Sequence, residues 1–216
     1  MGSSSVGTKV LIAVTGLALF GFLIIHLAGN LLVLSGPDAF NTYSHKLISN
    51  PLIYLAEAGL AALFVVHIWK TISNYFRNRA ARPAGYEVKR PAGHTSRKTV
   101  SSTSMIVTGT TILVFLILHL TTFKFGAYYD AAEPGVRDLY RLTLEVFHKP
   151  GYVIWYVVAM GLIGMHLRHG ITSALQSLGA MPASVTRGLL TAGAIVAFLI
   201  AAGFAIVPIW VYLFTQ

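Results

Sequence analysis

The stretch that decides the fold is Thr8–Leu34, which reads TKVLIAVTGLALFGFLIIHLAGNLLVL. After Lys9 it contains no Asp, Glu, Lys or Arg, and a membrane-spanning helix needs about 20 mostly apolar residues. A secretory signal peptide has a short apolar core followed by a small-residue cleavage site, whereas this stretch is longer and has no such site. We therefore expect a retained transmembrane helix with His26 inside it.

Four further stretches have the same character, and Gly and Pro residues punctuate the gaps between them. The sequence predicts an all-α integral membrane bundle of five transmembrane helices, forming one transmembrane domain over residues 1–216. The fifth helix has no histidine, and we expect it to face lipid or another subunit. The expected helices cover residues 8–34, 52–76, 102–125, 152–178 and 186–214.

The composition is that of a chain dissolved in lipid. Of the 216 residues, 55% are hydrophobic and 11% are charged, whereas a typical soluble protein has about 25% charged residues. The mean hydropathy is +0.69. These values exclude disorder, a fibrous repeat and an ordinary cytosolic enzyme. The absence of cysteine excludes disulfides, iron–sulfur ligation, thiolate zinc sites and covalent c-type haem attachment.

The basic residues predict the orientation. The link between the second and third helices carries seven Lys or Arg residues between positions 77 and 98 and only Glu87 against them. The links on the other side of the membrane mix both signs of charge. The positive-inside rule then places the basic link and the N-terminus in the cytoplasm, as in a multi-pass protein of the cell inner (cytoplasmic) membrane. We interpret the net charge of +9 as a topology signal and a phospholipid contact, with no nucleic-acid partner.

Each of the first four helices carries one central histidine. Ionisable residues inside membrane spans are rare and usually functional. With a rise of 1.5 Å per residue, the four histidines fall into two layers about 10–13 Å apart along the membrane normal. His26 and His119 form the outer layer, and His67 and His166 form the inner layer.

Two layers of two histidines favour two haem groups over one metal ion. Metal–nitrogen bonds are only about 2 Å long, so one ion cannot reach both layers. Two bis-histidine sites can each hold a b haem without covalent links, so that the first four helices form a haem-binding core and an electron conduit. A proton relay of histidines in a haem-free transporter is the alternative from another class of protein.

The first and third helices share a pattern that suggests an internal repeat. Nine residues separate Val14–Gly16 from His26, and nine residues separate Val107–Gly109 from His119. Both glycines lie about 15 Å inward of these histidines, near the depth of the inner layer. Because glycine has no Cβ, we expect a ring edge to approach the backbone there, with close helix packing by small residues as the alternative.

Several motifs together resemble the dihaem cytochrome b subunit of succinate:quinone oxidoreductases, a family that includes quinol:fumarate reductases. The resemblance covers nearly the whole chain, and its specificity lies in the combination. The motifs are FLIIHL over 22–27 followed by Asp38, Phe40, Asn41 and His45, then Phe115-x-x-x-His119-Leu with FKFG over 123–126, and His166-Leu-Arg-His-Gly170-x-x-Ser173-x-x-Gln176-Ser-Leu-Gly179.

The resemblance implies a five-helix anchor that binds two b haems and a quinone, with menaquinone favoured. It implies two cytoplasmic partner subunits, an iron–sulfur protein and a flavoprotein with covalent FAD that carries the succinate site. The chain would be the electron-transfer subunit of a succinate dehydrogenase or fumarate reductase, the respiratory complex II of the tricarboxylic acid cycle. A cytochrome b subunit of a hydrogenase, formate dehydrogenase or nitrate reductase is the alternative.

The family's axial ligands fall on His26 with His119 and on His67 with His166. Some fumarate reductases of the family carry a glutamate two residues before the fourth-helix ligand, where this sequence has Gly164, so we expect no proton route through that position.

Further residues are candidates for contacts around the cofactors. Haem propionates need cations or hydrogen-bond donors, and helical Ser and Thr are expected to support the histidine Nδ1 atoms. His169 is also a rival axial ligand or a quinone contact, whereas His148 is expected to be solvated and His94 to have no specific role. The candidates for the propionates are Lys70, Arg77, Arg97, Lys98, Arg168 and His169, and those for an outer quinone pocket are Asn30, Tyr43 and His45.

Overall fold

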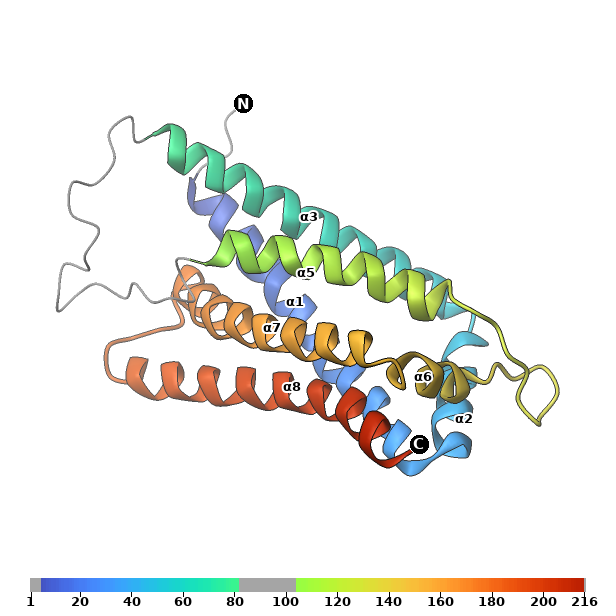
Figure 1. Cartoon of the computed structure of the whole chain (residues 1–216). Helices are drawn as coiled ribbons and strands as arrows, with labels where there is room; N and C mark the ends of the chain where they lie inside the picture. Colours follow the sequence, from blue (N-terminus) through green and yellow to red (C-terminus); the bar gives the residue numbers. More distant parts are fainter. Residues whose placement is uncertain (1–4, 82–103, 216) are drawn as a thin grey trace.

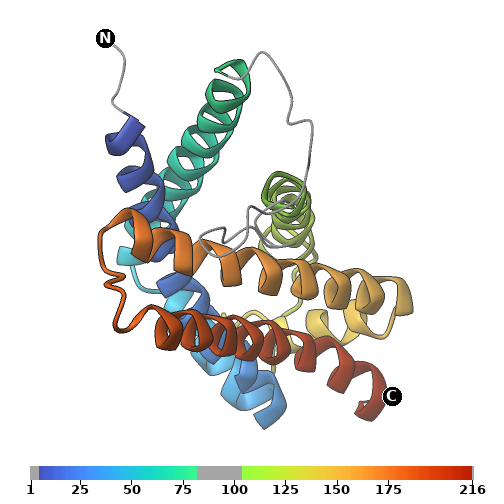
Figure 2. The same cartoon turned by 90° about the vertical axis from the view of Figure 1, so that its left-hand side faces the viewer.

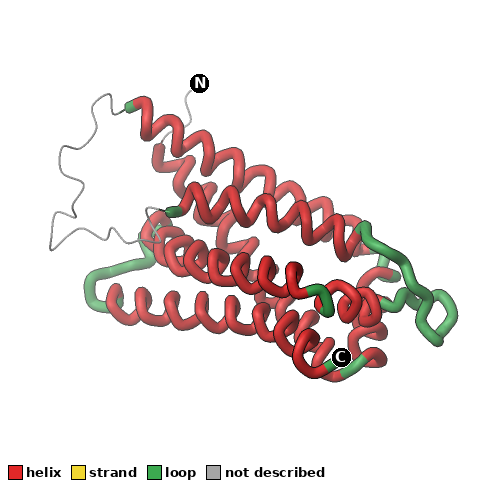
Figure 3. The backbone as a smooth tube through the Cα atoms, in the orientation of Figure 1, coloured by secondary structure: helices red, strands yellow, loops and turns green. Residues whose placement is uncertain are grey.

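The computed structural model describes residues 5–81 and 104–215, and most of these residues are helical (Figure 1). No strand occurs in this part of the chain, where an isolated bridge joins Asp130 and Arg137 (Figure 3). The prediction of an all-α chain with five long apolar helices is confirmed. These helices are α1 (Ser5–Leu31), α3 (Leu52–Ala80), α5 (Met105–His119), α7 (Pro150–Ser177) and α8 (Thr186–Phe214).

The longest helices exceed what a bilayer requires, and the shortest reaches that length with its continuation. At 1.5 Å per residue, the 29 residues of α3 extend about 44 Å, compared with a hydrocarbon core of about 30 Å. α1 continues into the 3-10 helix η1 (Leu32–Ser35), and α5 continues into the π-helix η2 (Leu120–Lys124). With these extensions, all five helices are long and apolar enough to cross a membrane, as in a multi-pass membrane protein.

Two short helices that the sequence analysis did not predict lie in the links, at the end of the bundle where α8 finishes (Figure 1). α2 (Pro37–Ile48) starts after Gly36, whose φ of 96° favours glycine. α6 (Leu139–Phe147) starts after Asp138, whose side chain accepts a hydrogen bond from the Arg141 backbone N–H. We call this end of the molecule the α2–α6 end.

Polar contacts fasten the α2–α6 end. The buried Asn41 of α2 donates to Asp138 Oδ1 at 2.8 Å and accepts from the Tyr140 backbone N–H at 2.9 Å. In the link before α6, the Tyr129 hydroxyl donates to Glu145, and this bond raises the pKa of Tyr129. An ion pair between Glu57 and Lys124 joins the start of α3 to η2.

The helices pack unevenly. α7 packs on α8, α1 and α5, whereas α3 packs on α1 and has no buried residue. In both views α3 lies on the opposite side of the molecule from α8 (Figures 1 and 2). One face of α8 packs on α7 and α1 of the same chain. Its other face, which includes Phe198, is exposed.

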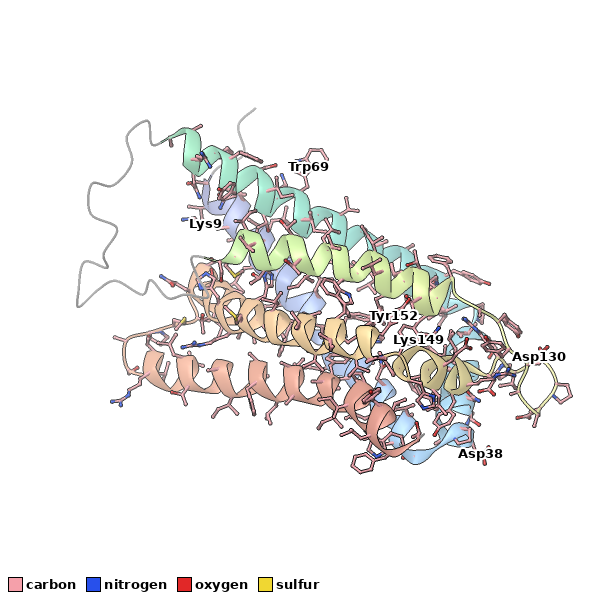
Figure 4. The ribbon with its side chains drawn as sticks, viewed as in Figure 1. Lys9, Asp38, Trp69, Asp130, Lys149 and Tyr152 are labelled. Carbon is pink, nitrogen blue, oxygen red and sulfur yellow. The ribbon has the colours of Figure 1, made fainter. Side chains whose placement is uncertain are left out.

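Charge differs between the two ends of the bundle. Lys9 lies near the start of α1, whereas Asp38 and Asp130 lie at the α2–α6 end (Figure 4). The opposite end, at the start of α1, carries Arg79 of α3 and Arg187 of α8. All carboxylate side chains within residues 5–81 and 104–215 belong to the α2–α6 end and the neighbouring start of α3: Asp38, Glu57, Asp130, Glu133, Asp138 and Glu145.

Candidate cofactor site

Thr15 and Thr108 hold the two inner histidines. The Thr15 Oγ1 of α1 lies 3.1 Å from Nδ1 of His67 on α3. The Thr108 Oγ1 of α5 lies 3.2 Å from Nδ1 of His166 on α7. Both threonines are buried, so water does not compete for these bonds. The same residue type therefore supports a histidine on the next long helix in each half of the bundle.

The threonines also decide which histidine nitrogen is free. A threonine hydroxyl has one hydrogen to donate. Thr15 donates it to the Leu11 carbonyl at 2.8 Å, and Thr108 donates to the Ser104 carbonyl at 3.1 Å. With its hydrogen engaged in this way, each hydroxyl can accept a second bond from the histidine Nδ1–H. In a neutral imidazole this leaves the lone pair on Nε2, the nitrogen available to a metal.

Gly16 and Gly109 bring the same imidazoles close to the backbone. A Cβ at Gly16 would lie 3.1 Å from Cε1 of His67, and one at Gly109 would lie 3.4 Å from Cε1 of His166. A larger side chain at either position would displace the ring. The Thr-Gly pairs of the sequence repeat therefore form matching cradles, one on α1 for His67 and one on α5 for His166.

The outer pair is brought together directly. The rings of His26 on α1 and His119 on α5 have centroids 5.8 Å apart and planes at 86°. Phe22 stacks on His26 with centroids 5.2 Å apart, and Phe115 stacks on His119 at 5.7 Å. Each phenylalanine comes four residues before its histidine, so both halves of the repeat use the same stacking contact.

Tyr156 of α7 is a residue of this site that the sequence analysis missed. Its hydroxyl lies 3.2 Å from Nδ1 of His119, and its side chain is buried. A signal was present, because Tyr156 precedes His166 by ten residues, about 15 Å along the helix, which is the depth of the outer layer. The outer histidine of α5 thus also has a hydroxyl at Nδ1.

His166, and not its neighbour His169, occupies the cradle on α5. His67 and His166 lie close enough to interact electrostatically. His166 occupies the Thr-Gly cradle of α5 in the way that His67 occupies the cradle of α1, whereas His169 lies one turn further along α7. Trp69, two residues after His67, projects away from the bundle, which agrees with His67 on the inward face of α3 (Figure 4).

The candidates for a quinone pocket lie at different distances from His26. Asn30 donates from Nδ2 to the His26 carbonyl at 2.8 Å. Tyr43 lies against Gly29, where a Cβ would come within 2.6 Å of its ring. Asn30, and Gly29 against which Tyr43 lies, are therefore about one turn along α1 from His26. His45 is exposed on α2.

The candidates for propionate contacts separate into two groups. Lys70 and His169 are partly buried and lie one turn beyond His67 and His166, toward the end where α1 starts, and Arg77 lies further along α3. Arg168 lines a groove with α8, next to Leu190 and Phe198, and is two residues, about 200°, around α7 from His166. Arg97 and Lys98 lie outside the described residues, as does His94.

Two other positions have clear surroundings. His148 was expected to be solvated, but its Nε2 lies 3.0 Å from Thr215 Oγ1, at the end of α8, and it is partly buried because α6 packs on α8. A Cβ at Gly164 would lie 3.0 Å from that of Ala201, so this position faces α8 and has no room for a glutamate without displacing that helix.

Comparison with protein-family models, with curated proteins and with solved structures found no match in any of the three. The chemistry of the site therefore rests on its own geometry. Two metal–nitrogen bonds of about 2 Å each separate a pair of ligating nitrogens by about 4 Å. Imidazole rings with centroids 5.8 Å apart, as in the outer pair, are compatible with that separation. The donor set, two neutral imidazoles per layer, fits a bis-histidine haem.

Proposed function

We propose that this chain is a membrane cytochrome b subunit that binds two b haems, one between His26 and His119 and one between His67 and His166. The observation that carries the proposal is the duplicated cradle, in which Thr15 and Thr108 present Nε2 of the two inner imidazoles. A proton relay does not require a fixed Nδ1–H tautomer, whereas metal ligation through Nε2 does.

A haem iron closed on both axial sides by imidazole exchanges single electrons and has no open position for oxygen chemistry. The chain contributes the ligands, their orientation and an apolar surrounding. Phe22 and Phe115 cover one face of each outer imidazole, and the two inner imidazoles lie against backbone at the glycines. Such surroundings exclude water and influence a haem's reduction potential.

We further propose that the subunit serves a succinate:quinone oxidoreductase, with an iron–sulfur and a flavoprotein partner. The support is the resemblance of the motifs in the first, third and fourth helices to that family. The basic residues at the end where α1 starts would face these cytoplasmic partners, and Asn30 and Tyr43 would lie near a quinone bound at the outer pair.

Co-purification from the native membrane tests the identity of the complex. The proposal expects a flavoprotein that oxidises succinate, an iron–sulfur protein and two b haems to purify with this chain. A molybdenum or nickel protein in place of the flavoprotein would favour the formate dehydrogenase, nitrate reductase or hydrogenase alternative. A chain that purifies without haem and shows no reduced-minus-oxidised spectrum would favour the transporter.

A further inference from the structure

The surroundings of Tyr156 hold its hydroxyl next to Nδ1 of His119. Its ring makes edge contacts with Phe115 and Phe147, each with centroids 4.9 Å apart, and with Phe123 at 6.2 Å. Only 6% of its surface is exposed. The hydroxyl lies 3.2 Å from Nδ1 of His119, so the aromatic cage fixes the oxygen at the back of this imidazole.

This contact differs from the threonine contacts of the inner pair. The hydroxyls of Thr15 and Thr108 have backbone carbonyls within hydrogen-bond distance as well as a histidine Nδ1. Within the described part of the chain, the Tyr156 hydroxyl has His119 as its hydrogen-bond partner. When Nε2 of His119 binds a metal, Nδ1 carries the hydrogen and the tyrosine oxygen accepts it.

We propose that Tyr156 is the positioning residue of the outer haem, a role that rests on the proposed function. By accepting the Nδ1 hydrogen, Tyr156 orients His119 with Nε2 toward the iron and increases the electron donation of the imidazole. A more basic ligand stabilises the oxidised iron, so this bond lowers the reduction potential of the outer haem. Tyr156 would therefore influence the potential of one haem through His119.

The test is the Tyr156→Phe protein, prepared as the full chain with its partners. This substitution keeps the buried ring and removes only the oxygen. Redox titration followed by optical and electron paramagnetic resonance spectra reports each haem separately, and the signal missing from a His26→Ala protein identifies the outer one. We expect Tyr156→Phe to retain both haems, to shift the outer potential to a more positive value and to leave the inner potential unchanged.

Two controls make the result specific. Tyr152→Phe removes a hydroxyl one turn away on the same helix, where the ring is 38% exposed, and should shift neither potential. Thr108→Val should weaken binding of the inner haem and leave the outer potential unchanged. The role of Tyr156 would be refuted if Tyr156→Phe kept two haems and left the outer potential unchanged, or if it shifted both potentials equally. Neither result would contradict the proposed function. A wild-type protein without b haem would overturn the proposed function as well.

Discussion

Single residues influence which nitrogen of an inner histidine is free to bind a metal. Thr15 and Thr108 have their hydroxyl hydrogens engaged with backbone carbonyls, and this leaves them as acceptors for Nδ1–H of His67 and His166. A threonine inside a helix usually perturbs the helix only mildly, because its hydroxyl donates to a backbone carbonyl of the preceding turn. Here the same hydroxyl also lies within hydrogen-bond distance of a histidine Nδ1, where it favours the tautomer with its hydrogen on Nδ1.

Replacing Thr15 or Thr108 with valine should weaken the inner haem. Valine keeps the shape of the side chain but leaves the buried Nδ1–H without an acceptor, and loss of such a partner typically reduces metal affinity by roughly 10- to 100-fold. Haem retention during purification, measured per chain, checks this. Thr110→Val is the matched control, because Thr110 is exposed on α5 and bonds only to the Ile106 carbonyl. Equal haem loss in all three proteins would contradict the prediction.

Leucine at Gly16 or Gly109 should displace the inner haem before the outer one. The added side chain would push on His67 or His166, since a Cβ alone already comes within 3.1 or 3.4 Å of Cε1. The expected result is a protein with about one haem, measured as a pyridine haemochrome. Gly21→Leu serves as control because a Cβ at this position of α1 meets nothing within 4 Å. Retention of both haems in Gly16→Leu would argue against the cradle.

At the scale of elements, the long helices work in pairs, in which one helix holds the histidine of the next. α1 cradles the histidine of α3, and α5 cradles that of α7, so the sequence repeat appears as a repeated helix–helix contact. α3 has no buried residue and packs on α1, whereas α7 packs on α1, α5, α6 and α8. A cofactor held by His67 would therefore add contacts to the least covered helix of the site.

The sequence was sufficient to predict the long helices, because a stretch of about 20 mostly apolar residues has few other stable structures. It did not predict α2 and α6, which are short and contain polar residues. Their starts depend on the backbone of Gly36 and on the side chain of Asp138. Tyr156 was missed because its spacing from His166 gives only its depth, whereas the rotation of α7 that turns it toward His119 is a property of packing.

Asn41→Ala should loosen the contact between α2 and α6. The buried amide makes two hydrogen bonds to this part of the chain, with Asp138 and with the Tyr140 backbone. Unpaired buried polar groups typically cost about 1–3 kcal/mol, so thermal unfolding followed by circular dichroism in detergent should start at a lower temperature. Asn78→Ala, at an exposed position of α3, should unfold like the wild type. An unchanged transition in Asn41→Ala would refute the structural role.

At the scale of the whole molecule, the distribution of charge predicts how the bundle and its two histidine pairs are oriented across the membrane. The carboxylates gather at the α2–α6 end, while the end where α1 starts is basic in the described residues. On the basis of the positive-inside rule, we propose that the basic end faces the cytoplasm. His26 and His119 would then lie toward the outside, and His67 and His166 toward the cytoplasmic partners.

Single cysteines can test this direction, because the natural chain has none. Ser49→Cys lies at an exposed position in the link at the α2–α6 end, and Ser184→Cys lies at an exposed position between α7 and α8. A membrane-impermeant maleimide added to intact spheroplasts should label position 49 and should reach position 184 only after lysis. The reverse labelling would invert the orientation, and the wild type reports the background.

The most direct test of the central claim is the haem content of the purified chain and of its four single His→Ala variants, at positions 26, 67, 119 and 166. The account predicts two b haems in the wild type, with a reduced-minus-oxidised b-type spectrum. Substitution at position 26 or 119 should remove the same spectral component, and substitution at position 67 or 166 the other. A wild type without haem, or four variants that all retain two haems, would contradict it.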